Sequence, residues 1–220
     1  GYVSPTWGMC TLLPSASNYA DAVSTWAFGS RSAYLSATRA WLGAHQLNGT
    51  TIVEPTGVDS RNASTPSDLL AIGQLAAANP ALARITSMTS ATVPGVGEVD
   101  NTNDLLGSGG ITGLKTGNNG PGTFALLYSA SFGIGLDDPV NVIGVSLDGQ
   151  SREQVDADVS RALHSIAAGV HRIGGAEGGP PGGGRARRRG GSGPPLLRPR
   201  AGPLTGGGPP EPPPAPAVLA

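Results

Sequence analysis

The chain has 220 residues, enough for one domain with a hydrophobic core and an appended segment. Its 14 basic and 15 acidic side chains give a formal charge of −1, so the overall charge does not indicate binding to nucleic acid. The single cysteine, Cys10, excludes an internal disulfide framework, and the apolar runs are too short for a transmembrane helix.

The chain divides at about residue 173. Residues 1–173 carry 8 Lys and Arg against 13 Asp and Glu (8 − 13 = −5), whereas residues 174–220 carry 6 against 2 (6 − 2 = +4). More than half of residues 174–220 are Gly or Pro, and such a segment cannot bury enough apolar surface to offset its chain entropy. We therefore expect a folded unit over 1–173 and a disordered Gly/Pro/Arg-rich tail over 174–220.

The first part of the chain has the pattern of amphipathic helices. Apolar side chains recur at helical spacing in 18–28 and again in 31–46. Trp26 and Trp41 share this spacing, so we expect them to be packing residues rather than platforms for sugar binding.

A third helix is predicted from Thr65 to Asn79. Thr65 can act as the N-cap, Pro66 suits the first helical position, and Asp68 can return a hydrogen bond to the cap. Asn79 ends the helix because it precedes Pro80, whose ring disfavours the α conformation in the residue before it.

From about residue 90 the pattern changes from helix to strand. Gly95-Val96-Gly97 predicts a hairpin, and β-rich segments follow at 111–116, 123–134 and 140–148. These segments follow one another without intervening helices, which favours an antiparallel sheet. An amphipathic helix is predicted at 151–173. The fold class is therefore α+β: helices first, then a sheet, then a closing helix.

The strongest local signal for chemistry is the triplet Lys115-Thr116-Gly117, at the end of a predicted strand. Lys115 is the only lysine in a chain whose other basic residues are arginines. A lysine on an edge strand also discourages aggregation, so the triplet by itself does not decide between a functional and a structural role.

The second signal is Ser15, in a loop that runs directly into the helix predicted at 18–28. A serine at the mouth of a helix is well placed to present its hydroxyl to a cleft. The structural alternative is an N-cap, in which Ser17 or Asn18 would accept hydrogen bonds from free amide groups.

Four segments, in this order, resemble the D-alanyl-D-alanine carboxypeptidases of the S11 peptidase family, which are low-molecular-mass penicillin-binding proteins. Such active-site serine enzymes use S-x-x-K, then S-x-N, then K-T-G. The matching segments, within about residues 11–172, are LLPSASNYADAVSTWAFGS, EPTGVDSRNASTPSDLLAIGQLA, NTNDLLG and ITGLKTG. The resemblance implies a β-lactamase/transpeptidase-like fold, here incomplete: an antiparallel sheet flanked by helices, a helical lobe, and an active site between them.

The resemblance also implies catalytic roles. In the family a serine attacks the carbonyl of the terminal D-Ala-D-Ala peptide bond and forms an acyl-enzyme, which water then hydrolyses. Ser15 would help to move a proton to the leaving amine. Lys115 would hold the substrate carboxylate and lower the pKa of the neighbouring hydroxyl.

Other positions are expected to bind the substrate. Thr116 would donate a hydrogen bond to the carboxylate, Gly117 would allow close backbone approach, and the amide of Asn118 would be an oxyanion-hole donor. The second motif departs from S-x-N, because Ser17 stands where the family has Asn, with Asn18 one place later. Ser17 can still donate and accept a hydrogen bond.

The first motif is absent from the 220 residues. The residue three places before the only lysine is Thr112, which belongs to the same predicted strand as that lysine. In the family the nucleophile and its lysine lie several dozen residues ahead of the S-x-N element. The resemblance therefore implies an N-terminally truncated fragment of a catalytic domain, inactive by itself.

The implied function is removal of the terminal D-alanine from peptidoglycan stem peptides in the cell envelope, outside the cytoplasmic membrane, without a cofactor. The expected partners are a stem peptide ending in D-Ala-D-Ala and, for the full-length parent, β-lactams as inhibitors. Nucleic acid is not expected, and membrane association would depend on missing or altered segments. His45, His164 and His171 share no metal spacing, so no metal site is expected.

Two other functions stay open. A class A β-lactamase carries a deacylating Glu shortly after the second motif, and Glu54 follows Ser15 by 39 residues. The Pro-Thr-Gly sequence after Glu54 and the NTNDLLG segment match the carboxypeptidases better. A non-catalytic cell-wall-binding pseudoenzyme would keep the cleft without the chemistry.

Overall fold

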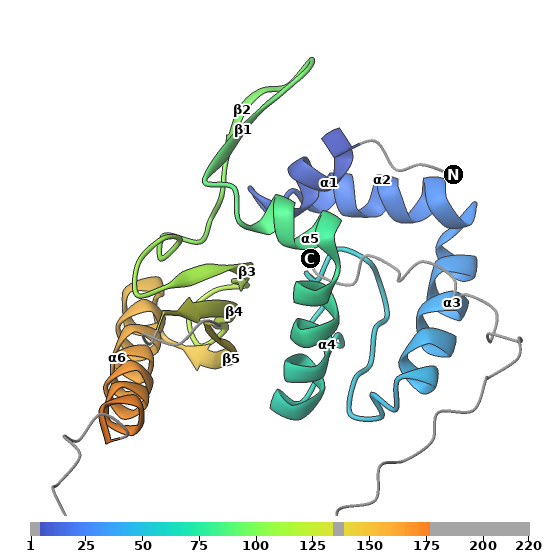
Figure 1. Cartoon of the computed structure of the whole chain (residues 1–220). Helices are drawn as coiled ribbons and strands as arrows, with labels where there is room; N and C mark the ends of the chain where they lie inside the picture. The colour runs from blue at the N-terminus through green and yellow to red at the C-terminus, as the bar shows by residue number, and fades with distance from the viewer. Residues whose placement is uncertain (1–4, 134–138, 177–220) are drawn as a thin grey trace, which may run out of the picture.

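The computed structural model describes residues 5–133 and 139–176 (Figure 1). Its elements in chain order are α1 (Pro5–Leu12), α2 (Ser17–Phe28), α3 (Arg31–Ala44), α4 (Pro66–Ala78), α5 (Pro80–Thr86), β1 (Ser90–Val93), β2 (Gly97–Asp100), β3 (Ile111–Gly117), β4 (Phe124–Phe132), β5 (Val140–Gly149) and α6 (Arg152–Ala176). Helix α6 continues three residues past the predicted boundary at 173. The tail predicted to be disordered lies, from residue 177 onward, outside the described residues.

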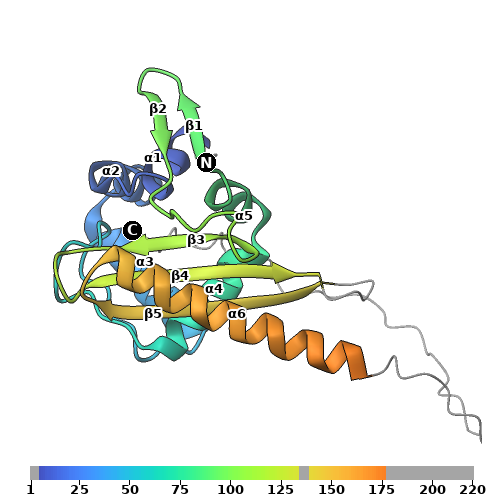
Figure 2. The same ribbon diagram turned by 90° about the vertical axis from the view of Figure 1, so that its left-hand side faces the viewer.

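The main sheet is antiparallel in the order β3-β4-β5, and β1 pairs with β2 as a separate hairpin. Figures 1 and 2 show α6 on one face of the main sheet and α4 on the other, so this part of the molecule has three layers. The β1–β2 hairpin projects away from them. The predicted α+β fold, an antiparallel sheet flanked by helices, is confirmed.

Strand β4 joins the two sides of the core because neighbouring side chains on a strand point to opposite faces. Leu126 faces α6, where it packs with Val155, Val159 and Leu163. Leu127, the next residue, faces the other way and packs with Ala76 of α4. The apolar stripe of α6 is therefore buried along its first three turns.

The start of α4 differs in one respect from the prediction. Thr65 caps the helix as expected and accepts a hydrogen bond from the amide of Asp68, at 3.2 Å. The Asp68 carboxylate, however, accepts bonds from the amide of Gly49 (2.9 Å) and the hydroxyl of Thr50 (2.7 Å). The reason is tertiary: the loop before the helix folds back over it and supplies these donors.

Helix α1 was not predicted, and its last residue, Leu12, was expected to belong to the loop that carries Ser15. Its segment contains Gly8 and has no clear helical periodicity. Nevertheless Cys10 and Leu12 are buried, and the helix contacts α2, α5 and β1. Packing against these three elements stabilises a helix that local propensity alone does not favour.

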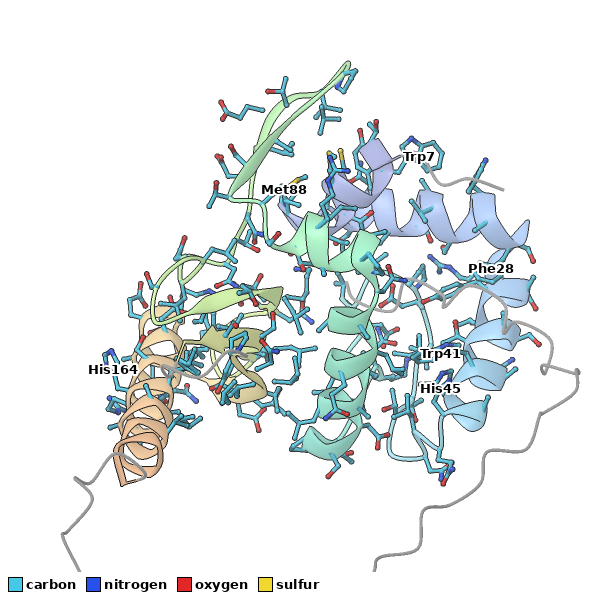
Figure 3. All side chains as sticks on the ribbon, in the orientation of Figure 1. Trp7, Phe28, Trp41, His45, Met88 and His164 are labelled. Carbon is cyan, nitrogen blue, oxygen red and sulfur yellow. The ribbon has the colours of Figure 1, made fainter. Side chains whose placement is uncertain are left out.

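The two tryptophans expected to be packing residues differ from each other. Trp41 is partly buried against the apolar cluster around Leu42, and its ring lies 4.3 Å from that of His45 (Figure 3). Trp26 is 48% exposed and meets Trp7 edge to face, with ring centroids 5.9 Å apart. Both tryptophans therefore pack against other aromatic side chains, Trp41 in a partly buried position and Trp26 in an exposed one.

Among the residues that the structure describes, none of the helices combines the length and apolarity needed to cross a bilayer.

Candidate functional site

The structure brings together two of the sequence-predicted site residues that lie 100 positions apart. The ammonium nitrogen of Lys115, on β3, donates a hydrogen bond to the hydroxyl oxygen of Ser15, between α1 and α2. It donates a second bond to the backbone carbonyl of Thr116, at 2.9 Å. The sheet therefore contributes the amine, and the helical part contributes the hydroxyl.

The loop that carries Ser15 is held from both sides. Ser15 has φ +57°, a left-handed conformation that is uncommon for a residue with a side chain. The amide of Ala16 donates to the carbonyl of Cys10 at 3.2 Å, which closes the turn between the two helices. Leu13, just before the loop, is fully buried. Neighbouring contacts thus maintain a backbone conformation that a flexible serine would rarely adopt.

Burial changes the acid–base behaviour of Lys115. The residue is only 4% exposed, and this desolvation lowers its pKa from the ordinary 10.5 to about 8, with a further contribution from the positive charge of Arg152. At pH 7 the amine is therefore still mostly charged, with about a tenth of it neutral. An amine of this kind can hold a negative charge in one step and take part in proton transfer in another.

Arg152 is a site residue that sequence reasoning missed. It is the first residue of α6, and its guanidinium donates to the carbonyl of Ala125 at 3.2 Å and lies 5.7 Å from the centre of the Phe124 ring. These contacts fix its charge near Lys115. A local pattern could not identify it, because it is one arginine among 13 and lies 37 residues after the lysine.

Thr116, the residue after Lys115, contacts the segment that precedes β3. It is 6% exposed, and its hydroxyl oxygen lies 2.6 Å from that of Thr102. Thr102 in turn contacts the carbonyl of Leu13 through its amide, at 3.1 Å, and through its hydroxyl, at 3.3 Å. The segment NTNDLLG therefore lies between the KTG strand and the Ser15 loop. The sequence marked this segment only as a resemblance and assigned it no role.

The remaining predicted residues lie nearby but make different contacts. Ser17 is the first residue of α2 and is partly buried, whereas Asn18 is exposed. Neither provides the N-cap, which is Ala16, without a side-chain bond to the helix. The capping alternative for Ser17 and Asn18 is therefore wrong: the helix begins one residue earlier than a cap at Ser17 requires.

Gly117 and Asn118 lie where β3 ends. A Cβ atom added to Gly117 would meet the Cβ of Ala125 at 3.6 Å, an ordinary contact, so the fold itself does not require glycine there. Asn118 is exposed and its side-chain oxygen accepts a bond from the amide of Gly120 at 2.8 Å. This bond stabilises the turn that follows the strand.

Glu54 is the centre of a separate hydrogen-bonded loop. Its carboxylate accepts bonds from the amide and hydroxyl of Thr56, from the amide of Asp59 and from the side chain of Asn62. Burial by itself would raise the pKa of the Glu54 carboxyl, but these bonds outweigh it and lower the pKa. An ionised carboxylate occupied in this way is suited to organising its loop rather than to accepting a proton from water.

The Glu54 loop is tied to the end of the KTG strand. The side-chain amide of Asn119 donates to the carbonyl of Gly57 at 2.9 Å, across 62 positions of sequence. The amide of Asn119 also donates to the hydroxyl of Thr123, at 2.7 Å, which orients the turn. Asn119 therefore connects the Glu54 loop to the turn that follows β3.

Replacing Asn119 by alanine is expected to loosen the Glu54 loop without unfolding the chain, because one hydrogen bond contributes about 0.5–1.5 kcal/mol. Amide hydrogen exchange of the loop amides, including those of Thr56 and Asp59, should become faster by about 2- to 12-fold. Asn118→Ala is the matched control, since Asn118 bonds only within its own turn. Equal exchange in the two variants would contradict this role.

Within residues 5–133 and 139–176, no group of three or more His, Cys, Asp and Glu side chains is arranged so that it could hold a metal ion. Figure 3 shows His164 on the side of α6 turned away from the sheet, and His45 beside Trp41 on α3. The side chain of His171 lies outside the described residues.

Solved structures share this architecture. Penicillin-binding protein D2 from Listeria monocytogenes, in its ampicillin-bound form, matches with a TM-score of 0.61 and 23% identity, over 76% of this chain and 66% of that chain. A mutant of the Streptomyces K15 DD-transpeptidase matches with a TM-score of 0.65 and 20% identity, over 76% and 69%. The D-alanyl-D-alanine carboxypeptidase of Mycobacterium tuberculosis H37Rv matches with a TM-score of 0.62 and 23% identity, over 82% and 66%.

The chain has the fold of the low-molecular-mass penicillin-binding proteins. It spans 66% and 65% of the length of two Listeria structures of this fold. No family model and no curated protein matches the sequence. In this penicillin-binding fold, the pair of Ser15 and Lys115 lies where the sheet meets the helical part.

Proposed function

We propose that this chain supplies the proton-transfer and carboxylate-binding part of a serine-type D-Ala-D-Ala carboxypeptidase, which removes the terminal D-alanine of peptidoglycan stem peptides. The observation that carries the proposal is the hydrogen bond from Lys115 to Ser15. The neighbouring positions of Thr116 and Arg152 support it, because they add a hydroxyl donor and a second positive charge.

The substrate of such an enzyme ends in a carboxylate, and each of these groups has a role toward it. Lys115 and Arg152 would attract the carboxylate, and Thr116 would donate a hydrogen bond to it. Gly117 has no side chain and would let the substrate backbone approach closely. The fold itself has room for a Cβ atom at this position and does not require glycine there. The amide of Asn118 would be one donor to the oxygen of the attacked carbonyl, and Ser17 and Asn18 would contact the substrate from the start of α2.

The chemical step needs a proton at the leaving nitrogen. A serine of an S-x-x-K segment, which this sequence does not contain, would add its oxygen to the carbonyl carbon and give its proton to the lysine of that segment, and the C–N bond to the last D-alanine would then break. Because Lys115 donates to Ser15, the hydroxyl proton of Ser15 is directed away from Lys115 and can pass to that nitrogen, while Ser15 takes a proton from the Lys115 ammonium. The proton taken up by the lysine of the S-x-x-K segment would then return to Lys115. Water would hydrolyse the resulting acyl-enzyme.

The alternatives make different demands on the same residues. A class A β-lactamase would use Glu54 as the base for deacylation, and the bonds that hold its carboxylate within its own loop favour the carboxypeptidase instead. A cell-wall-binding pseudoenzyme would bind the same peptide without cleaving it. A chain extended with its S-x-x-K segment would separate the two, since only the enzyme would release D-alanine.

As an enzyme of this kind, the protein would act in the cell envelope, outside the cytoplasmic membrane, where stem peptides are found. β-Lactams would inhibit an enzyme of this kind, as acyl donors that resemble its substrate. The structures of the Listeria protein with ampicillin and cefotaxime support this expectation.

Binding of a D,D-dipeptide to this chain tests the proposal. Because Lys115 is the only lysine, a chain made with ¹³Cε-labelled lysine gives a single NMR resonance from the site. N-acetyl-D-alanyl-D-alanine is expected to shift this resonance in a saturable manner, and N-acetyl-L-alanyl-L-alanine is the control. No saturable shift with the D,D-dipeptide, or equal binding of both dipeptides, would contradict the proposed function.

A further inference from the structure

Thr102 connects the two halves of the site through oxygen atoms. Its hydroxyl lies 2.6 Å from the hydroxyl of Thr116, on β3, and 3.3 Å from the carbonyl oxygen of Leu13, two residues before Ser15. Its amide donates to the same carbonyl at 3.1 Å. Thr116 is buried, whereas Thr102 is exposed, so a change at Thr102 can be made without opening the core.

The number of protons limits how these oxygens can bond. The carbonyl of Leu13 can only accept, and each threonine hydroxyl has one proton to donate. If Thr102 donates to Leu13, the short contact between the hydroxyls requires Thr116 to donate to Thr102. The proton of Thr116 is then engaged and cannot be given to a ligand.

The opposite arrangement releases that proton. If Thr102 donates to Thr116, the proton of Thr116 is free, and the carbonyl of Leu13 keeps only the bond from the amide of Thr102. Without a ligand the first arrangement is favoured, because it makes one more hydrogen bond. A carboxylate reverses the preference, since a hydrogen bond to a charged acceptor is about twice as strong as one between neutral groups.

We propose that Thr102 is a positioning residue that sets the direction of the Thr116 hydroxyl bond and so couples carboxylate binding at Thr116 to the loop that carries Ser15. This inference rests on the proposed function, which brings a carboxylate to Thr116. On binding, the Thr102 proton turns from Leu13 to Thr116, and the carbonyl of Leu13 loses one of its two donors. Binding of a carboxylate to the Thr116 hydroxyl thus changes the hydrogen bonds of the backbone at Leu13, two residues before Ser15.

The free chain tests the arrangement of protons. The ¹³C carbonyl shift of Leu13 reports the number of hydrogen bonds that this oxygen accepts. Thr102→Val removes the hydroxyl but keeps the shape of the side chain and the amide bond, so the Leu13 carbonyl signal is expected to move. Thr102→Ser keeps a hydroxyl and is expected to leave the signal near its wild-type position. A merely structural role of the side chain would make the two variants alike.

Addition of N-acetyl-D-alanyl-D-alanine tests the coupling. In the wild-type chain and in Thr102→Ser, the Leu13 carbonyl signal is expected to move on binding toward its position in free Thr102→Val. In Thr102→Val it is expected to stay unchanged, although the Lys115 resonance still reports binding.

Different results would contradict the positioning role of Thr102 and the proposed carboxypeptidase function. Binding by the wild-type chain without movement of the Leu13 signal, or equal movement in Thr102→Val, would overturn the role of Thr102 alone. If the Lys115 resonance does not respond to the dipeptide in any variant, the proposed function fails, and the role of Thr102 fails with it.

Discussion

A Lys115→Met variant is expected to bind N-acetyl-D-alanyl-D-alanine about 10- to 150-fold more weakly, because a hydrogen bond to a charged group contributes about 1.5–3 kcal/mol. The same variant is expected to be more stable than the wild-type chain at pH 7, by about 1–3 kcal/mol. The reason is burial: a pKa lowered from 10.5 to about 8 corresponds to about 3 kcal/mol against the charged amine. The loss of the bonds to Ser15 and Thr116 offsets part of this gain.

The dependence of stability on pH tests whether desolvation of the Lys115 amine causes the stability difference between the wild-type chain and Lys115→Met. The pKa of Lys115 is lower in the folded chain than in the unfolded chain, so the unfolded chain binds more protons between about pH 8 and pH 10.5. Across this window the wild-type chain is expected to gain stability relative to Lys115→Met, and the difference between them should shrink. Urea unfolding at a series of pH values measures it.

Two further variants control this experiment. Arg84→Met removes an exposed positive charge and is expected to change stability by less than about 0.5 kcal/mol. Arg152→Met removes the charge that acts on Lys115, and is expected to raise the pKa of the amine, seen in the pH titration of its ¹³Cε resonance. A Lys115→Met variant that is less stable at pH 7, with no narrowing toward pH 10.5, would show that the buried amine is not desolvated.

Treated with a fluorescent penicillin, the 220-residue chain is expected to remain unlabelled. Covalent reaction requires an activated nucleophile, and the sequence holds no S-x-x-K. Ser15 receives a hydrogen bond from Lys115, which withdraws electron density from its oxygen rather than activating it. A longer chain that carries an S-x-x-K segment ahead of residue 1 is expected to be labelled at the serine of that segment.

Mass spectrometry of the intact chain after incubation with the drug gives the measurement, and Ser15→Ala is the matched control. An adduct on the wild-type chain that is missing from Ser15→Ala would make Ser15 itself a nucleophile. That result would replace the proton-transfer role proposed for it. An adduct on both chains would place the reactive group elsewhere.

Much of the secondary structure follows from local rules. Gly29, with φ +79°, ends α2, and Asn79 ends α4 and then caps α5. The hairpin turn falls at Gly95, and the strands begin and end within a few residues of the predicted positions. Caps, turns and periodic apolar residues act over a few positions, so the sequence displays them directly.

Other features depend on contacts that no local pattern contains. Helix α1 is stabilised by its neighbours, and the Asp68 carboxylate turns to a loop almost 20 residues earlier. Arg152 acts on Lys115 only because β5 pairs with β4, which places the start of α6 beside the end of β3. The lysine itself was notable in the sequence for being unique, but its rarity said nothing of its burial.

By itself, the sequence determined the order of α2, α3, α4, the strands and α6, the α+β class and the residues on which a site could be built, because these depend on spacing within short segments. Only the tertiary structure decided that Lys115 reaches Ser15, that Thr102 lies between their two segments and that Glu54 is held by its own loop. The contacts of Lys115 and Thr102 arise where β3 and the segment before it meet the turn between α1 and α2, whereas those of Glu54 arise within its own loop. The free energy of that packing is shared among many distant residues, so no single motif encodes it.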